Sequence, residues 1–148
     1  MTIEFRPITT DNLRPVGRLE VGPGQEHFVA PNLVSMAEWK FFPDWEPAAI
    51  HADGELVGFL MCGQDPEGDP FEWWIIRFMI AAEFQGRGYG REALKMALEL
   101  LMAKEECEAI LLSFEPDNEI AKRMYEEVGF VDTGRIEEGE HVYRLDWE

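Results

Sequence analysis

The stretch Gln85-Gly86-Arg87-Gly88-Tyr89-Gly90-Arg91 decides the fold, because it joins an apolar run to an amphipathic run. Residues 73–82 before it are typical of a buried strand. Residues 91–104 after it carry apolar side chains at helical spacing, namely Leu94, Ala97, Leu98 and Leu101. A strand, a glycine-rich turn and a helix together place backbone N–H groups where they can hold a phosphate. Two arginines add local positive charge.

The rest of the chain is strongly acidic. It has 30 acidic and 13 basic residues among 148, a formal net charge of −17. Such a charge disfavours nucleic acid and anionic membrane surfaces and favours a small cationic partner. The alternative is an acidic surface that only keeps the protein soluble or suits a salty habitat. The length fits one domain over residues 1–148.

The sequence shows neither a targeting signal nor a cysteine motif. Residues 1–7 show no signal-peptide pattern, and no apolar run approaches the roughly 20 residues of a membrane helix. We therefore expect a cytoplasmic protein with no membrane partner. Cys62 and Cys107 lack the spacing of a metal site, so two buried thiols are favoured over a disulfide or a metal ligand set.

The order of elements predicts one mixed α/β domain with helices between strands. A weak helix is expected around Leu13–Leu19, capped by Thr10 or Asp11, and a better one from Asn32 with Leu33, Met36 and Ala37 on one side. Residues 41–47 are expected to form a loop. Asp53-Gly54 suits the primed turn of a hairpin. The remaining predicted segments are strands at 2–8, 48–62 (the hairpin), 72–80, 108–114, 130–135 and 140–147, and helices at 91–104 and after Asn118 up to Gly129.

Two nucleotide motifs fail on the glycine turn. A Walker loop needs Gly-Lys-Ser/Thr, whereas this turn ends Gly-Tyr-Gly-Arg. A dinucleotide fingerprint counted from Gly86 and Gly88 would put Arg91 in the third glycine position, and it belongs after an early strand. A glycine-rich loop that merely turns the chain remains an alternative on these residues alone.

The turn resembles the phosphate-binding signature of the GNAT superfamily of N-acetyltransferases, Gln/Arg-x-x-Gly-x-Gly/Ala. The positions that match are Gln85, Gly88 and Gly90. A second family pattern, N-x-x-A-x-x-x-Y-x-x-x-G-F, is matched downstream by Asn118, Ala121, Tyr125, Gly129 and Phe130. The resemblance implies a mixed, mostly antiparallel sheet flanked by helices, with splayed central strands.

A narrower resemblance is to bacterial spermine/spermidine (diamine) N-acetyltransferases. It is carried by four short stretches: Phe28-Val-Ala-Pro-Asn32, Trp74-Ile-Ile-Arg77, Ser113-Phe-Glu-Pro-Asp-Asn118 and Gly139-Glu140. It implies that a polyamine accepts the acetyl group.

The family resemblance implies acetyl-coenzyme A as the co-substrate and no metal. Its pantetheine would run beside Phe78, Met79 and Ile80, where one N–H could polarise the thioester carbonyl. The amides of the glycine turn would hold the pyrophosphate. The predicted coenzyme A residues are Phe78, Met79, Ile80, Gln85, Gly86, Arg87, Gly88, Tyr89, Gly90, Arg91, Asn118 and Lys122.

Catalysis requires an acid for the departing thiolate and a base for the ammonium nucleophile. Tyr125 matches the family's general acid, although its spacing alone favours a core tyrosine. Many relatives place a glutamate on the strand before the glycine loop, where this chain has Ile75-Ile76-Arg77. Glu72 and Glu115 are the candidate bases, with plain surface carboxylates as the alternative.

Carboxylates along a groove would bind the charged amines of the acceptor. The candidates are Glu20, Glu26, Glu38 and Glu115, with Glu115 first. Trp39, Phe41 and Trp45 could line an apolar groove or contact another subunit, with core packing as the default. The family resemblance also allows a homodimer.

Three functional hypotheses follow. The first is an enzyme that N-acetylates polyamines or diamines, and the second changes the acceptor to an aminoglycoside, an amino acid or a protein N-terminus. The third is a non-catalytic acyl-coenzyme A binding module, against which the presence of Tyr125 argues.

Overall fold

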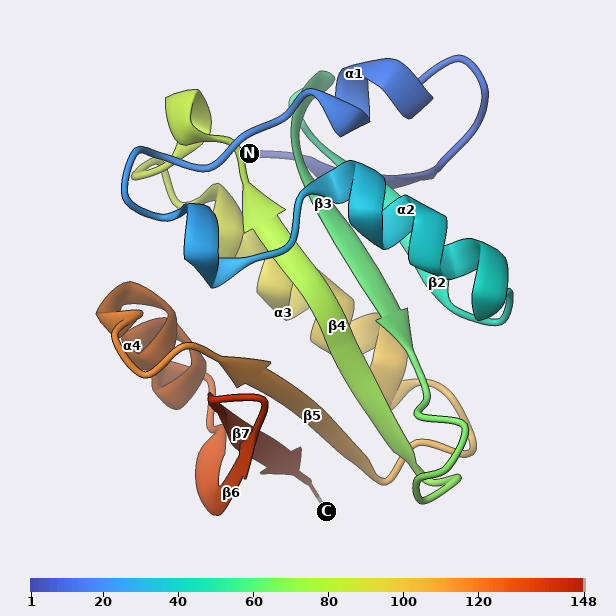
Figure 1. Ribbon diagram of the computed structural model, residues 1–148, viewed down its shortest axis with the longest axis vertical. Coiled ribbons are helices and arrows are strands. Elements are labelled where there is room, and N and C mark those ends of the chain that lie inside the picture. The colour runs from blue at the N-terminus through green and yellow to red at the C-terminus, as the bar shows by residue number, and fades with distance from the viewer. Residues whose placement is uncertain (148) are drawn as a thin grey trace.

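The chain is built around a seven-stranded sheet in the order β1-β2-β3-β4-β5-β7-β6 (Figure 1). The computed structural model describes residues 1–147. The strands are β1 (Ile3–Pro7), β2 (Glu46–Ala52), β3 (Glu55–Gly63), β4 (Glu72–Ile80), β5 (Ala109–Phe114), β6 (Val131–Glu137) and β7 (Glu140–Asp146). The helices are α1 (Leu13–Gly17), α2 (Asn32–Phe41), α3 (Tyr89–Met102) and α4 (Glu119–Glu127), with 3-10 turns η1 (Glu26–Phe28) and η2 (Ala82–Phe84).

The sheet is mostly antiparallel and splayed in its centre, as predicted. Every neighbouring pair is antiparallel except β4 and β5, which are parallel. Their ladder is short, because only Glu72–Trp74 pair with Ala109–Leu111. Beyond that point the two strands diverge, as Figure 1 shows to the upper left of their shared lower end.

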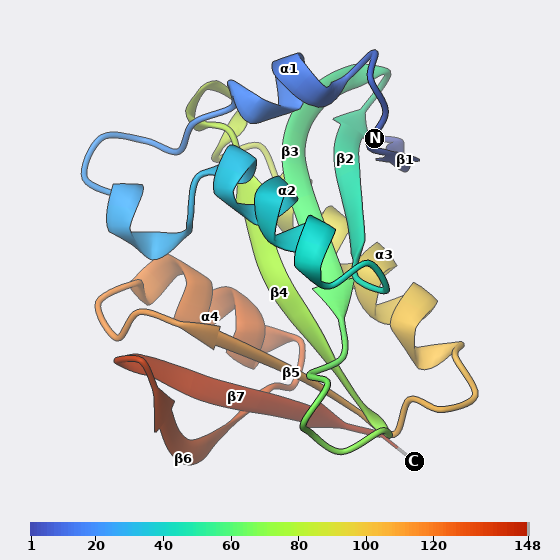
Figure 2. The same ribbon diagram turned by 45° about the vertical axis from the view of Figure 1, so that its right-hand side comes forward.

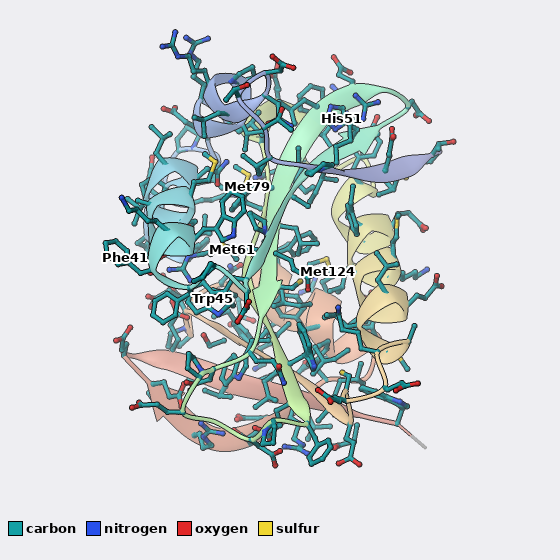
Figure 3. The ribbon with its side chains drawn as sticks, turned by 90° about the vertical axis from the view of Figure 1, so that its right-hand side faces the viewer. Phe41, Trp45, His51, Met61, Met79 and Met124 are labelled. Atoms are coloured by element: carbon teal, nitrogen blue, oxygen red, sulfur yellow. The ribbon has the colours of Figure 1, made fainter. Side chains whose placement is uncertain are left out.

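Helices cover both faces of the sheet, so the central strands are apolar on both sides. On β3, Phe59 and Met61 belong to the core under α1 and α2, whereas Leu60 belongs to the core that also holds Leu94 of α3 and Ala121 of α4. Figure 2 shows α1 and α2 on one side of the strands and α3 on the other. The labelled side chains of Figure 3 follow this division: Met61 and Met79 lie toward α2, and Met124 lies on the side of α3.

Local signals predicted several elements well. Asp53 and Gly54 both have positive φ, 51° and 85°, as a primed hairpin turn requires. Asn118 caps α4, and its side-chain oxygen accepts a hydrogen bond from the Ala121 N–H at 3.2 Å. Both cysteines are free and buried, so the expectation of two buried thiols is confirmed.

The buried face of α2 agrees with the prediction only at Met36. Leu33 and Ala37 are exposed, and the face toward the sheet is formed by Asn32, Ser35 and Met36. Asn32 is held inward because its side-chain amide donates a hydrogen bond of 2.9 Å to the Val16 carbonyl. A buried polar group is stabilised only with such a partner. The apolar pattern of α2 is therefore misleading.

Two helix boundaries also differ from the predictions. Helix α1 is short and begins after Asn12, with no side-chain cap from Thr10 or Asp11. Helix α3 begins at Tyr89 rather than Arg91, because Gly88 adopts the left-handed conformation at its N-cap. The helix N-terminus therefore lies inside the glycine turn.

Candidate active site

A cleft of about 1770 Å³ opens where β4 and β5 diverge. Its walls include Phe78, Met79 and Ile80 on β4, and Ser113 and Phe114 on β5. Pockets for a single drug-sized ligand occupy about 300–1,000 Å³. The cleft is therefore large enough for two substrates side by side.

The glycine turn forms one end of this cleft. Gly86 and Gly88 have φ values of 79° and 86°, and Gly86, Gly88 and Gly90 all line the cleft. Gln85 fixes the turn because its side-chain amide donates to the Ile80 carbonyl at 2.8 Å and to the Gln25 side chain at 3.0 Å. The first amides of a helix have no partner within the helix and attract anions. The turn and the start of α3 thus form an anion cradle.

Tyr125 lies on α4 beside the same cleft. Its ring packs against Phe114 and Phe130, with ring centroids 5.5 Å and 5.8 Å away, and only 7% of the residue is exposed. Burial, and next the negative charge of Glu140, raise the pKa of Tyr125 above its ordinary value. The hydroxyl therefore keeps its proton at neutral pH and can act as an acid.

The β6–β7 hairpin adds three carboxylates to the cleft, from Glu137, Glu138 and Glu140. Glu138 and Gly139 form the tight turn, both with positive φ. Glu140 begins β7 and is partly buried, and its Oε1 accepts a hydrogen bond of 2.7 Å from the Ser113 hydroxyl on β5. The hairpin is thus an acidic wall beside Tyr125.

A charged pair lies on the α2 side of the cleft. Arg77 on β4 donates through Nη2 to Glu38 on α2 at 2.9 Å and through Nη1 to the Ile76 carbonyl at 2.9 Å. Both charged residues line the cleft. Because Arg77 already neutralises Glu38, this pair contributes little net charge. On the hairpin Arg135 pairs with Glu137, so the free negative charge comes from Glu138 and Glu140.

The pattern of residues across this site is that of a known family. The model of the acetyltransferase (GNAT) family matches residues 19–130, most of the chain. This protein belongs to the GNAT acetyltransferase family.

Full-length relatives of this GNAT acetyltransferase include a spermine/spermidine N(1)-acetyltransferase of Bacillus subtilis strain 168. It is 31% identical over 147 residues, which cover 96% of this chain and 97% of the relative. The α/β fold is also that of solved acetyltransferases. The aminoglycoside acetyltransferase AAC(6')-Ib in complex with coenzyme A has a TM-score of 0.80 at 21% identity, over 98% of this chain and 95% of the other. Spermidine N-acetyltransferase from Vibrio cholerae, in complex with coenzyme A and spermine, has a TM-score of 0.75 at 20% identity, over 96% of this chain and 92% of the other.

Most residues that the sequence assigned to coenzyme A lie on the cleft of this GNAT acetyltransferase. They fit the ligand, because Gly86 has no atom within 4 Å of a Cβ position and its backbone is open to approach. Arg91 also lines the cleft, but its guanidinium is paired with Glu127 on α4. The predicted residues found in the lining are Phe78, Met79, Ile80, Gln85, Gly86, Gly88, Gly90, Arg91 and Asn118.

Three predicted coenzyme A residues lie outside the lining: Arg87, Tyr89 and Lys122. The guanidinium of Arg87 is instead 5.5 Å from the centre of the Phe84 ring. Of the predicted acceptor residues, only Glu38 lines the cleft, and Glu20 and Glu26 are exposed elsewhere.

Neither candidate base lines the cleft, and that expectation is corrected. Glu72 is at the start of β4 opposite Ala109, and it forms an ion pair with Arg144. Glu115 follows the far end of β5 and is outside the cleft lining. Since β4 and β5 are parallel, the start of one and the end of the other lie at opposite ends of the ladder.

Sequence reasoning missed Ser113 and the carboxylates of the hairpin as site residues. Gly139-Glu140 contributed to the narrower family resemblance, but the sequence assigned no site role to Glu137, Glu138 or Glu140. Three acidic residues in a tight turn were the available signal, but their position depends on the β5–β7 pairing.

No group of three or more His, Cys, Asp or Glu side chains within residues 1–147 is placed to hold a metal ion. Over the same residues, no helix has the length and apolar character needed to cross a membrane.

Proposed function

We propose that this protein transfers the acetyl group of acetyl-coenzyme A to a primary amine of a polyamine or diamine such as spermidine or spermine. The observation that carries the proposal is the acidic wall of Glu137, Glu138 and Glu140, which shares one cleft with Tyr125 and the glycine turn. The likeness to a spermine/spermidine N(1)-acetyltransferase over nearly the whole chain supports it.

The donor would lie in the gap between β4 and β5. Beyond Trp74, β4 pairs only with β3, so backbone groups on its other edge are free to bind the pantetheine amides. The amides from Gly86 to Gly90 and the positive end of the α3 dipole would bind the pyrophosphate. Acetyl-coenzyme A supplies the activated acetyl group, and these residues orient it.

Tyr125 would protonate the sulfur that leaves. Because its pKa lies above the ordinary value, the hydroxyl carries its proton over the whole neutral range and can donate it to the sulfur. The packing against Phe114 and Phe130 holds the ring in one position, which is what proton transfer at a fixed atom requires.

The acceptor would lie between the β6–β7 hairpin and the Glu38–Arg77 pair. A polyamine carries several ammonium groups, and the carboxylate of Glu138 can bind one that does not react, while Glu137 shares its charge with Arg135. Arg77 does not repel the cation strongly, because Glu38 at 2.9 Å offsets its charge. The groove therefore selects positive charge on the acceptor.

Initial rates with acetyl-coenzyme A and a panel of amines test the proposal. The panel contains spermidine, spermine, putrescine, kanamycin and free amino acids, and thiol release reports turnover. We expect kcat/KM for at least one polyamine to exceed that for amino acids by about tenfold or more, a difference of about 1.4 kcal/mol. Absence of turnover with every polyamine would refute it.

The acidic wall has its own test. Exposed charge pairs contribute about 0.2–1 kcal/mol each, so Glu138→Gln should raise KM for spermidine about 1.5- to 5-fold. KM for acetyl-coenzyme A should stay unchanged, since the change is confined to the acceptor side. Equal effects on both substrates would argue against this division of the cleft.

The other acceptors are outcomes of the same panel. Preferred turnover of kanamycin, an amino acid or a peptide N-terminus would show an acetyltransferase whose acceptor is that amine and not a polyamine. Coenzyme A binding without turnover of any amine would favour an acyl-coenzyme A binding module. Homodimer formation stays a prediction, which sedimentation velocity tests.

A further inference from the structure

The reaction needs a group that removes a proton from the acceptor ammonium, because an alkylamine with a pKa near about 10 is charged at neutral pH. β4 carries no carboxylate beside the cleft, since Glu72 lies at its far end. The base must therefore come from another element. The carboxylates that line the cleft within residues 1–147 are Glu38, Asp65, Glu67, Glu127, Glu137, Glu138 and Glu140.

Most of these carboxylates are unsuited to the task. Glu38 is paired with Arg77, Glu127 with Arg91 and Glu137 with Arg135. An arginine partner stabilises the ionised carboxylate and so weakens it as a base. The other carboxylates except Glu140 are exposed on the β3–β4 loop and the hairpin: Asp65, Glu67 and Glu138.

Glu140 differs in burial and in its partner. It is partly buried, and a neutral hydroxyl, that of Ser113, donates to its Oε1 at 2.7 Å. One hydrogen bond fixes the carboxylate without cancelling its charge. Oε2 is the oxygen left to meet an amine.

Glu140 is also close to the group that acts at the other end of the reaction. Its charge is one of the two causes that raise the pKa of Tyr125, after burial. Both residues line the cleft. A base and an acid on either side of the reacting atoms are what amine acetylation requires.

We propose that Glu140 is the catalytic base that accepts the proton of the acceptor ammonium, and that Ser113 positions it. This inference rests on the proposed function, since it concerns the same cleft and the same reaction.

Oε2 of Glu140 takes one proton from the ammonium, and the freed lone pair forms the bond from nitrogen to the acetyl carbonyl carbon. As the bond from that carbon to sulfur breaks, Tyr125 gives its proton to the sulfur. The nitrogen loses its second proton, which restores the Tyr125 hydroxyl through solvent. Glu140 returns its proton to water, so one proton is released per turnover.

The main test is Glu140→Gln, which keeps the shape and can still accept the Ser113 hydrogen bond. We expect kcat with spermidine to fall by about 10²- to 10⁴-fold, the usual contribution of a general base. In the wild type, kcat should fall as the pH is lowered through the titration of the base, and the variant should lack this limb. Calorimetric titration of spermidine into the coenzyme A complex should show affinity reduced by no more than about fivefold.

A second measurement uses an acceptor amine that is already neutral and therefore needs no base. Hydroxylamine and trifluoroethylamine are neutral at the assay pH, so with them wild type and Glu140→Gln should turn over at rates within about tenfold. A structural defect would lower both rates alike. Ser113→Ala should lower kcat less than Glu140→Gln and shift the midpoint of the acid limb.

Glu138→Gln is the matched control, because Glu138 lies on the same hairpin, lines the same cleft and loses the same charge. It should raise KM for spermidine and leave kcat and the pH profile unchanged. Equal losses of kcat in the two variants would reduce Glu140 to one more binding charge and overturn the inference.

His27 is the rival base, because it lines the cleft with its Nε2 2.9 Å from Asp117. Loss of the acid limb in His27→Gln instead of Glu140→Gln would assign the proton to that pair and overturn the inference. If the wild type acetylates another amine and no polyamine, the same variants are compared with that amine. A kcat loss confined to Glu140→Gln there would support Glu140 while the polyamine proposal fails, and an unchanged kcat would overturn both.

Discussion

Gly90→Ala should separate coenzyme A binding from stability. Gly90 is the second residue of α3 and has no positive φ, so alanine suits its backbone. A Cβ there would lie 3.6 Å from Ile80 Cγ1 and 3.8 Å from Met124 Sδ, which are ordinary contacts. Since glycine within a helix is less stable than alanine by about 0.5–1 kcal/mol, the variant should be as stable as the wild type or slightly more so.

Coenzyme A binding should weaken in the same variant, because Gly90 lines the cleft beside Ile80 and Met124. The added methyl group would crowd the bound coenzyme A, and overpacking of a close contact costs about 1–3 kcal/mol. At about 1.4 kcal/mol per tenfold, the dissociation constant should rise roughly 5- to 150-fold. Calorimetric titration measures it, and urea denaturation measures stability on the same samples.

Gly88→Ala, unlike Gly90→Ala, should lower the stability of the protein. Its φ of 86° lies in the left-handed region, which costs an alanine about 1–2 kcal/mol, although the new Cβ would have only Met1 Cε nearby at 3.7 Å. Gly134→Ala on β6 is the control, with a φ of 82° and nothing within 4 Å of its Cβ position. It should lose similar stability and bind coenzyme A normally. A folded Gly90→Ala protein with wild-type coenzyme A affinity would refute the assignment of the glycine turn.

Tyr125→Phe should lower kcat by about 10²-fold or more and leave the affinity for coenzyme A nearly unchanged in calorimetry, whereas a loss of binding alone would contradict its role as the acid. Burial, and next the charge of Arg6, lower the pKa of His51, so its contribution to stability is present above about pH 6.5 and is lost as the pH falls. His51→Gln should therefore lose less stability than the wild type between about pH 7.5 and 5.5, and parallel pH curves would contradict this. Burial raises the pKa of the Cys62 thiol to about 12 and also raises that of Cys107, so both should react with Ellman's reagent only after unfolding. Fast labelling of the native protein would contradict their burial.

The elements that local sequence could predict are those fixed by neighbouring residues. β4 could be predicted at its observed bounds because its apolar run follows a polar loop and ends before the glycine turn. Asn118 was identified as a cap because its side chain needs only the amide three residues ahead. The match of Gln85, Gly88 and Gly90 to a family signature likewise depends on spacing within one turn.

The acceptor side depends on contacts between distant segments. Ser113 and Glu140 meet only through β5–β7 pairing, 27 residues apart, and Glu38 meets Arg77 across 39 residues. Such contacts decide which carboxylates are free, which are paired and which lie outside the cleft. Glu72 was therefore indistinguishable from a site residue by sequence, although Arg144 pairs with it at the other end of β4.

A crystal structure of the protein with coenzyme A and spermidine tests the central claim most directly. We expect the pyrophosphate on the amides from Gly86 to Gly90, the sulfur at the Tyr125 hydroxyl, and one amine nitrogen within hydrogen-bond distance of Glu140. Coenzyme A bound outside the gap between β4 and β5, or an amine bound away from the β6–β7 hairpin, would contradict it.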